Sequence, residues 1–211
     1  MHDSQTQTKQ DCGNPTLDEM FAFYTCMQFR CSNELCSHET CSKTLVYSVE
    51  LQAVLVGGSQ HQDDRDDSQM LRALQYWSRP RICPNMAHRA CPKCQRKNIL
   101  KCTRVFATAP TVLVVCHRSF AGLEDFVRPN IIKDLDIAQF CLTTDTLPNT
   151  KYHLLGFLVH HPNADGGHYI AYVKRDNQWW RLDDERVNCA SPEEVGQQCA
   201  YILFFRQQSS C

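Results

Sequence analysis

The most informative stretch of this 211-residue chain runs Gly166-Gly167-His168-Tyr169-Ile170-Ala171-Tyr172-Val173 and continues, after a polar segment, as Trp179-Trp180-Arg181-Leu182-Asp183-Asp184. The alternation from Tyr169 to Val173 predicts a β-strand, and Arg175-Asp176-Asn177-Gln178 is typical of a turn. A second strand from Trp179 to Leu182 would return antiparallel. We expect this hairpin to place Asp183 across from His168, roughly 5 Å away between the paired backbones.

A histidine beside a carboxylate is the base-and-orienter half of a nucleophilic triad. A neutral imidazole takes a proton from the nucleophile, and a carboxylate on its other nitrogen fixes its tautomer and orientation. Gly166 and Gly167 would let the chain turn tightly and leave His168 open to a substrate tail. The alternative interpretation is a buried histidine beside an ordinary turn aspartate, which is the more common fate of a lone His and Asp.

The segment from Tyr152 to Arg206 resembles the His box of the ubiquitin-specific proteases, the papain-like cysteine deubiquitinases. The family pattern is Tyr-x-Leu, Val-x-His, Gly-Gly-His-Tyr-x-x-Tyr, a Trp before an apolar-Asp-Asp, a Val, and a final Ala-Tyr-x-Leu-Phe-Tyr strand. The matching residues are Tyr152-His153-Leu154, Val159-His160, Gly166 to Tyr172, Trp179 to Asp184, Val187 and Ala200 to Phe205. By this resemblance His168 is the catalytic histidine and Asp183 its carboxylate partner. Asp184 and His160 match further recurrent positions, and Pro162 departs from the family's usual Gly.

Two clusters of cysteines indicate a zinc site. The first contains Cys31, Cys36, His38 and Cys41, and the second is Cys91-Pro92-Lys93-Cys94. Zinc takes four thiolate or imidazole ligands in a tetrahedron, and Cys-x-x-Cys supplies two of them from one tight turn. The alternative is that these cysteines are small buried apolar residues.

The resemblance also implies a structural zinc in the family's fingers subdomain, which combines an early Cys pair with a later Cys-x-x-Cys. Counting back from the predicted strand Val49-Glu50-Leu51 favours Cys31 and Cys36 as the early pair. The expected zinc ligands are therefore Cys31, Cys36, Cys91 and Cys94, with Cys41 or His38 as substitutes within the first cluster.

Composition narrows the class of protein. The net charge is −1, so no general attraction to nucleic acid or membranes is expected. No apolar run approaches the roughly 20 residues that span a bilayer, and the N-terminus lacks the basic and apolar regions of a signal peptide. The 14 cysteines, without a secretion signal, favour zinc plus scattered free thiols over a disulfide scaffold. We expect an intracellular protein of the cytoplasm, the nucleus or both.

The elements expected along the chain give an α+β fold. Strands are predicted over 44–56, 102–107 and 111–116, and a helix over 68–77, where Leu71, Leu74 and Trp77 recur at helical spacing. A short strand or helix is expected from Phe21 to Phe29. The polar composition of residues 1–20 indicates a flexible N-terminal segment. By resemblance, 21–109 is a zinc-tipped antiparallel fingers subdomain and 110–211 a palm sheet with the His box. The thumb of the papain-like fold is expected to be missing.

The family's nucleophile lies in a Gly-x-x-Asn-x-Gly-Asn-Thr-Cys-Tyr box, and no such stretch occurs in the 211 residues. Cys12-Gly13-Asn14-Pro15 has the wrong order, so Cys12 is not expected to be the nucleophile. The resemblance implies thiol-dependent hydrolysis at the C-terminal Gly of ubiquitin, with this chain alone inactive. Ubiquitin or ubiquitinated proteins, and a missing thumb segment or partner chain, are the expected partners. The alternative is a catalytically inactive ubiquitin-binding pseudoenzyme or a zinc-containing scaffold.

Overall fold

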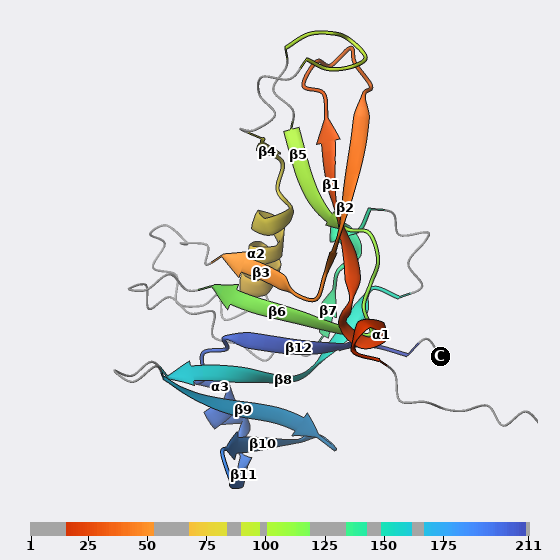
Figure 1. The fold of residues 1–211 in the computed structure, drawn as a ribbon. Coiled ribbons are helices and arrows are strands. Elements are labelled where there is room, and N and C mark those ends of the chain that lie inside the picture. Colours follow the sequence, from red (N-terminus) through yellow and green to blue (C-terminus); the bar gives the residue numbers. More distant parts are fainter. Residues whose placement is uncertain are drawn as a thin grey trace, which may run out of the picture.

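The structure is a computed structural model that describes residues 16–52, 68–83, 90–97, 101–118, 134–142, 149–161 and 167–209. These residues form a four-stranded sheet in the order β2-β1-β5-β4 and an eight-stranded sheet (Figure 1). Strands dominate, and the few helices pack around them. This architecture confirms the predicted α+β fold class.

The four-stranded sheet is antiparallel throughout. It consists of β1 (Phe23–Arg30), β2 (Glu39–Val46), β5 (Lys101–Phe106) and the short β4 (Arg81–Ile82). Arg30, the last residue of β1, pairs with Glu39 at the start of β2 and with Lys101 at the start of β5. The connection from β1 to β2 and the segment that enters β5 therefore lie at the same end of the sheet, the upper tip in Figure 1.

The eight-stranded sheet has the order β11-β10-β9-β8-β12-β6-β3, and β7 pairs with β8 beside this path. Only the pairing of β3 with β6 is parallel among the strand pairs of the described residues. The strands are β3 (Val49–Gln52), β6 (Val112–Arg118), β7 (Asp134–Asp136), β8 (Lys151–His161), β9 (His168–Arg175), β10 (Gln178–Asp183), β11 (Arg186–Ala190) and β12 (Ile202–Gln207).

The single strand predicted over 44–56 was wrong, because the chain leaves one sheet and joins the other within it. Strand β2 ends at Val46 and β3 begins at Val49. The change of sheet cannot be recognised from the sequence, because the residues before and after it both have high strand propensity. Burial separates them: β2 is exposed over most of its length, whereas Val49 and Leu51 are buried in the core. Residues 53–56 lie outside the described residues.

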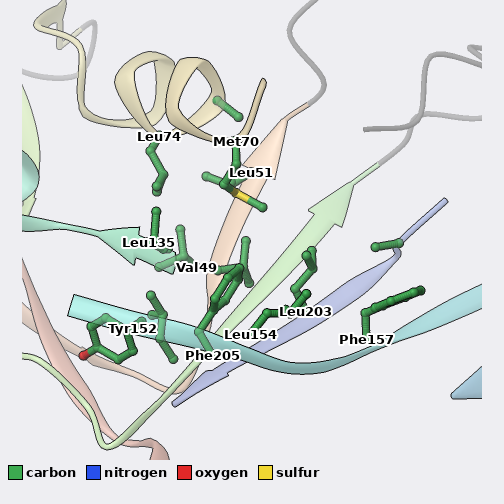
Figure 2. Close-up of a cluster of buried hydrophobic side chains, with 14 of the residues drawn as sticks. Val49, Leu51, Met70, Leu74, Leu135, Tyr152, Leu154, Phe157, Leu203 and Phe205 are labelled. Atoms are coloured by element: carbon green, nitrogen blue, oxygen red, sulfur yellow. The ribbon is translucent and has the colours of Figure 1, made fainter. Parts of the chain in front are cut away.

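The main core lies where helix α2 (Ser68–Ser78) packs against the eight-stranded sheet. Met70 and Leu74 of the helix meet Leu51 of β3 and Leu135 of β7 (Figure 2). The helix and its buried stripe were predicted from the spacing of Leu71, Leu74 and Trp77, and the structure confirms this prediction. The core continues across the sheet through buried residues of β8 and β12, which are Tyr152, Leu154, Phe157, Leu203 and Phe205.

Three short elements complete the described fold: α1 (Leu17–Phe21), the 3-10 helix η2 (Ala138–Phe140) and α3 (Pro192–Gly196). Thr16 and Glu19 form a capping box at the start of α1, so the end of the predicted flexible segment is helical. Residues 1–15 of that segment lie outside the described residues. Among the described helices, none is long and apolar enough to cross a membrane.

The predicted division at 109/110 stays a proposal. Strand β3 and helix α2 fall before that boundary in sequence, yet β3 pairs with β6 in the eight-stranded sheet and α2 packs on the same core. The sheet that holds the predicted His box therefore takes residues from both sides of the division.

Gly156 provides a test of this packing. It lies in β8 opposite Val173 of β9, and a Cβ at Gly156 would overlap the backbone carbonyl oxygen of Tyr172. We expect Gly156→Ala to lower the free energy of unfolding by about 1–3 kcal/mol, because the two strands would have to separate. Gly196→Ala is the control, since its Cβ would meet nothing within 4 Å. Chemical denaturation measures both, and equal stabilities for the two variants would contradict the packing.

Candidate active site and metal centre

A two-residue turn joins the strands that hold the predicted catalytic residues. Asp176 and Asn177 both adopt positive φ, at 50° and 62°, and Arg175 pairs with Gln178 across them. Positive φ at both central residues is the geometry of a type I′ turn, whose twist matches that of paired antiparallel strands. The turn predicted over 175–178 is therefore confirmed, and it fixes the register of β9 against β10.

This register corrects one expectation. The last pair of the β9–β10 ladder is Leu182 with Ala171, so Asp183 falls two residues short of the position opposite His168. The expectation of a directly opposed pair was wrong, because the pairing of Arg175 with Gln178 brings the position two residues beyond Asp183 opposite His168. The two side chains are instead diagonal neighbours on one face of the sheet, a separation that long side chains bridge.

The diagonal arrangement still brings His168 and Asp183 into contact. Nε2 of His168 lies 2.6 Å from Oδ1 of Asp183. The His168 side chain is 41% exposed and the Asp183 side chain 20% exposed, so the pair lies at the surface with its carboxylate more covered than its imidazole. Since Nε2 is engaged by Asp183, Nδ1 is the ring nitrogen left to exchange a proton with another group.

The surroundings keep Asp183 ionised. The hydrogen bond from His168, together with the nearby guanidinium of Arg181, lowers the pKa of the Asp183 carboxyl below its ordinary value, although desolvation opposes the shift. The stabilisation from this group is therefore complete above the ordinary Asp pKa of about 3.9, and is lost as the pH falls through the lowered pKa. At neutral pH the site holds a carboxylate ready to accept from the imidazole.

A groove of about 530 Å³ opens beside the pair. It is lined by His168, Asp183, Asp184, Glu185 and Arg186. Polar atoms of His168, Asp183 and Asp184 lie within 4.8 Å of one another. The Asp183 carboxylate already accepts hydrogen bonds from two basic side chains. These contacts explain why the polar atoms lie close together, so a bound metal ion is not needed to explain the cluster.

The chain approaches His168 through Gly167, which has φ of +106°. A Cβ at this position would overlap the imidazole of His160. That imidazole stacks on the Tyr169 ring at a centroid distance of 4.5 Å. Gly167 is thus required both by its backbone conformation and by the space His160 occupies. Gly166 and Pro162 lie outside the described residues.

The two predicted cysteine clusters meet at the tip of the four-stranded sheet. Cys31 and Cys36 lie in the connection from β1 to β2, and Cys91 and Cys94 lie in the segment before β5. The Sγ atoms of Cys31 and Cys94 are 3.8 Å apart, and those of Cys36 and Cys91 are 3.7 Å apart. All four Sγ atoms lie within 4.8 Å of one another, so these residues could hold one metal ion.

The two suggested substitutes do not join the cluster. Cys41 is bonded to Cys26 in a disulfide between β1 and β2. His38 contributes its backbone carbonyl oxygen, which accepts from the backbone N–H of Cys31. A side-chain bond from Lys93 to Ser37, with Nζ to Oγ at 2.7 Å, also ties the two loops together.

The expectation of free thiols was wrong at four positions. Besides the Cys26–Cys41 disulfide, a second joins Cys83 to Cys102. In both cases the register makes the partners diagonal neighbours: Cys41 faces Gln28, and Cys102 faces Arg81. Sequence spacing alone does not show cross-strand neighbours, which is why these pairs were not predicted.

Two of the clustered thiols have pKa values shifted in opposite directions. The backbone N–H of Arg96 is the largest of several influences that lower the pKa of Cys94 to about 6. The backbone N–H of His38 lowers the pKa of Cys36, but burial and the neighbouring thiols outweigh it and raise that pKa to about 11. Four thiolates cannot coexist here without a compensating positive charge.

Arg181 is a site residue that the sequence analysis missed. Its Nη2 lies 2.6 Å from Oδ2 of Asp183. The available signal was its spacing, since residues two apart on a strand share one face.

Comparison with known proteins agrees with this geometry. The sequence pattern described as ubiquitin carboxyl-terminal hydrolase matches residues 2–205. Human ubiquitin carboxyl-terminal hydrolase 15 is 29% identical over 129 residues, which cover 57% of this chain and 13% of that protein. Ubiquitin carboxyl-terminal hydrolase 12 of Saccharomyces cerevisiae is 32% identical over 141 residues, covering 63% of this chain and 11% of the relative.

Solved structures share the fold. The SAGA Ubp8/Sgf11/Sus1/Sgf73 DUB module bound to ubiquitin aldehyde matches with a TM-score of 0.74 and 18% identity, over 92% of this chain and 43% of that one. A second structure of the same module matches with a TM-score of 0.64 and 19% identity, over 92% of this chain and 39% of that one. The chain thus spans a small part of its curated relatives and less than half of these structures. With its sequence matched almost from end to end, the chain belongs to the ubiquitin carboxyl-terminal hydrolase family, within a ubiquitin-specific protease domain.

Proposed function

We propose that this chain serves deubiquitination, the thiol-dependent hydrolysis of isopeptide or peptide bonds at the C-terminal Gly of ubiquitin. The observation that carries the proposal is the 2.6 Å contact between His168 Nε2 and Asp183 Oδ1 at the edge of a groove. The family membership supports this reaction class, and the contact supports the role proposed for each residue.

The roles follow from the geometry. Asp183 holds the proton on Nε2 and orients the ring, so that Nδ1 takes the proton of a cysteine thiol. The thiolate attacks the carbonyl carbon of ubiquitin's terminal Gly, and the resulting imidazolium returns its proton to the departing lysine amine. Water, deprotonated by the same nitrogen, then hydrolyses the thioester and releases ubiquitin.

The nucleophile is the part of this reaction that the 211 residues do not supply. They contain no Cys box, and Cys12 lies outside the described residues. We propose that a segment or partner with that box completes the site, and that the 211 residues alone bind ubiquitin without cleaving it. Without a thiolate there is no acyl-enzyme to form.

Exposed apolar side chains support a further covering segment or partner. Tyr24 of β1 and Leu45 of β2 are opposed in register and are 43% and 45% exposed. Tyr47 and Leu17 are also exposed, at 49% and 73%. Large apolar side chains that remain in water are a common mark of protein interaction sites.

We also propose that the cysteine cluster binds structural zinc. With Zn–S bonds of about 2.3 Å, a tetrahedron places its sulfurs about 3.8 Å apart, which matches the two Sγ separations of 3.7 and 3.8 Å. A thiolate tetrahedron also suits zinc above hard cations such as magnesium. Cys31, Cys36, Cys91 and Cys94 would hold the ion, which would neutralise the clustered thiolates and fix both loops.

The zinc proposal predicts about one zinc per purified chain, measured by elemental analysis. Cys91→Ser should abolish binding and lower the stability of the tip, because structural zinc contributes folding energy directly. Cys189→Ser is the matched control, since Cys189 is a free and exposed cysteine on β11, and it should keep the zinc. Freshly purified protein without zinc would contradict the proposal.

The deubiquitinase proposal predicts binding without covalent capture. In NMR titrations, ubiquitin should shift signals of His168 and its neighbours, and ubiquitin that lacks its C-terminal Gly-Gly should not shift them. A ubiquitin with a C-terminal electrophile should leave the chain unmodified in mass spectra. Absence of any ubiquitin binding would overturn the proposal, and capture lost in one Cys→Ser variant would reveal a nucleophile within the 211 residues.

A further inference from the structure

We propose that Arg181 is a positioning residue for the His168–Asp183 pair. It holds the second carboxylate oxygen of Asp183 and lies opposite Tyr172, whose hydroxyl donates to Glu194 of helix α3. The importance of this role for catalysis rests on the proposed function, but the positioning itself is a property of the folded chain.

The two oxygens of Asp183 have different partners. Oδ1 lies 2.6 Å from His168 Nε2, and Oδ2 lies 2.6 Å from Arg181 Nη2. With both oxygens engaged, the carboxylate cannot rotate without breaking a charge-assisted bond. The Arg181 side chain is 30% exposed, so the contact is screened less than an open surface ion pair.

Arg181 lies directly opposite Tyr172 of β9 in register. Burial raises the pKa of the Tyr172 hydroxyl, whereas the nearby charge of Arg181 lowers it. That hydroxyl donates to Oε1 of Glu194 in α3 at 3.0 Å. The Tyr172 ring is buried and stacks on Phe157 at a centroid distance of 5.1 Å. The arginine therefore projects from a rigid part of the sheet.

The charge of Arg181 also affects where the shared proton resides. A guanidinium beside the carboxylate stabilises its ionised form, which favours the proton on Nε2 of His168 over transfer to Asp183. The hydrogen bond from Arg181 to Oδ2 keeps Oδ1 beside Nε2, which fixes one tautomer with Nδ1 open to the nucleophile. Without Arg181, no cation would contact Oδ2, and the pKa of the Asp183 carboxyl would be higher.

Other charged groups border the same site. Asp184, Glu185 and Arg186 line the groove with the pair, and His161 of β8 is opposite His168 in register. Among the described residues, His168 and Arg181 make the ion pairs with Asp183. Arg181 is thus the arginine in contact with the carboxylate.

The test uses NMR of the complete chain with labelled histidine and aspartate, without ubiquitin. In the wild type, the ¹⁵N shifts of His168 at neutral pH should show the Nε2–H tautomer. In Arg181→Met, that tautomer should give way to a mixture, and the titration midpoint of Asp183 should move to higher pH. Arg181→Lys should restore most of both signals, because its ammonium returns a donor to Oδ2 as well as the charge.

Arg175→Met is the matched control. Arg175 ends β9 on the same hairpin, and its side chain is 83% exposed, so its removal should change neither signal. Arg181→Gln separates positioning from charge, because its side-chain amide can donate to Asp183 but carries no charge. It should retain the Nε2–H tautomer, while the titration midpoint of Asp183 still rises. This variant also replaces Arg181→Met if the Met variant does not fold. The proposal would be overturned if a folded Met or Gln variant kept both the His168 tautomer and the Asp183 titration midpoint of the wild type.

Because no ubiquitin is present, this result is independent of the deubiquitinase proposal. A chain that fails to bind ubiquitin can still show the Arg181 effect. A chain that binds ubiquitin can equally show a tautomer that does not depend on Arg181.

Discussion

The register of β9 against β10 is the constraint on which the site depends. The two-residue turn at Asp176 and Asn177 sets it, and the pairs of Arg181 with Tyr172 and Leu182 with Ala171 follow. Asp183 then reaches His168 diagonally. A slip of one residue would move every β10 side chain to the opposite face, which would separate the carboxylate from the imidazole and the arginine from the tyrosine.

The four-stranded sheet is stabilised differently along its length. Near its base, Phe23 and Cys26 of β1 are buried, whereas β1 becomes exposed toward Arg30 and β2 is exposed almost throughout. A hydrophobic core therefore does not extend to the tip. The cluster of Cys31, Cys36, Cys91 and their neighbour Cys94 replaces it, and a bound metal would give the exposed hairpins the cohesion that apolar burial gives the other sheet.

Sequence patterns indicated the candidate residues because they lie in short, recognisable spacings. His168, Asp183 and the two cysteine pairs each lie in such a motif, and the structure brings each set together. What the sequence could not supply was pairing between strands. The diagonal offset of Asp183, the role of Arg181 and the Cys26–Cys41 disulfide all depend on register, which one sequence does not specify. The change of sheet between Val46 and Val49 was hidden because strand propensity is similar on both sides.

The register of β9 against β10 is tested most directly by the pattern of cross-strand NOEs in this hairpin. The structure predicts backbone contacts between Leu182 and Ala171, together with contacts from the His168 ring to the β-protons of Asp183. A register that sets Asp183 directly opposite His168, or NOEs that place their side chains on opposite faces of the sheet, would contradict it.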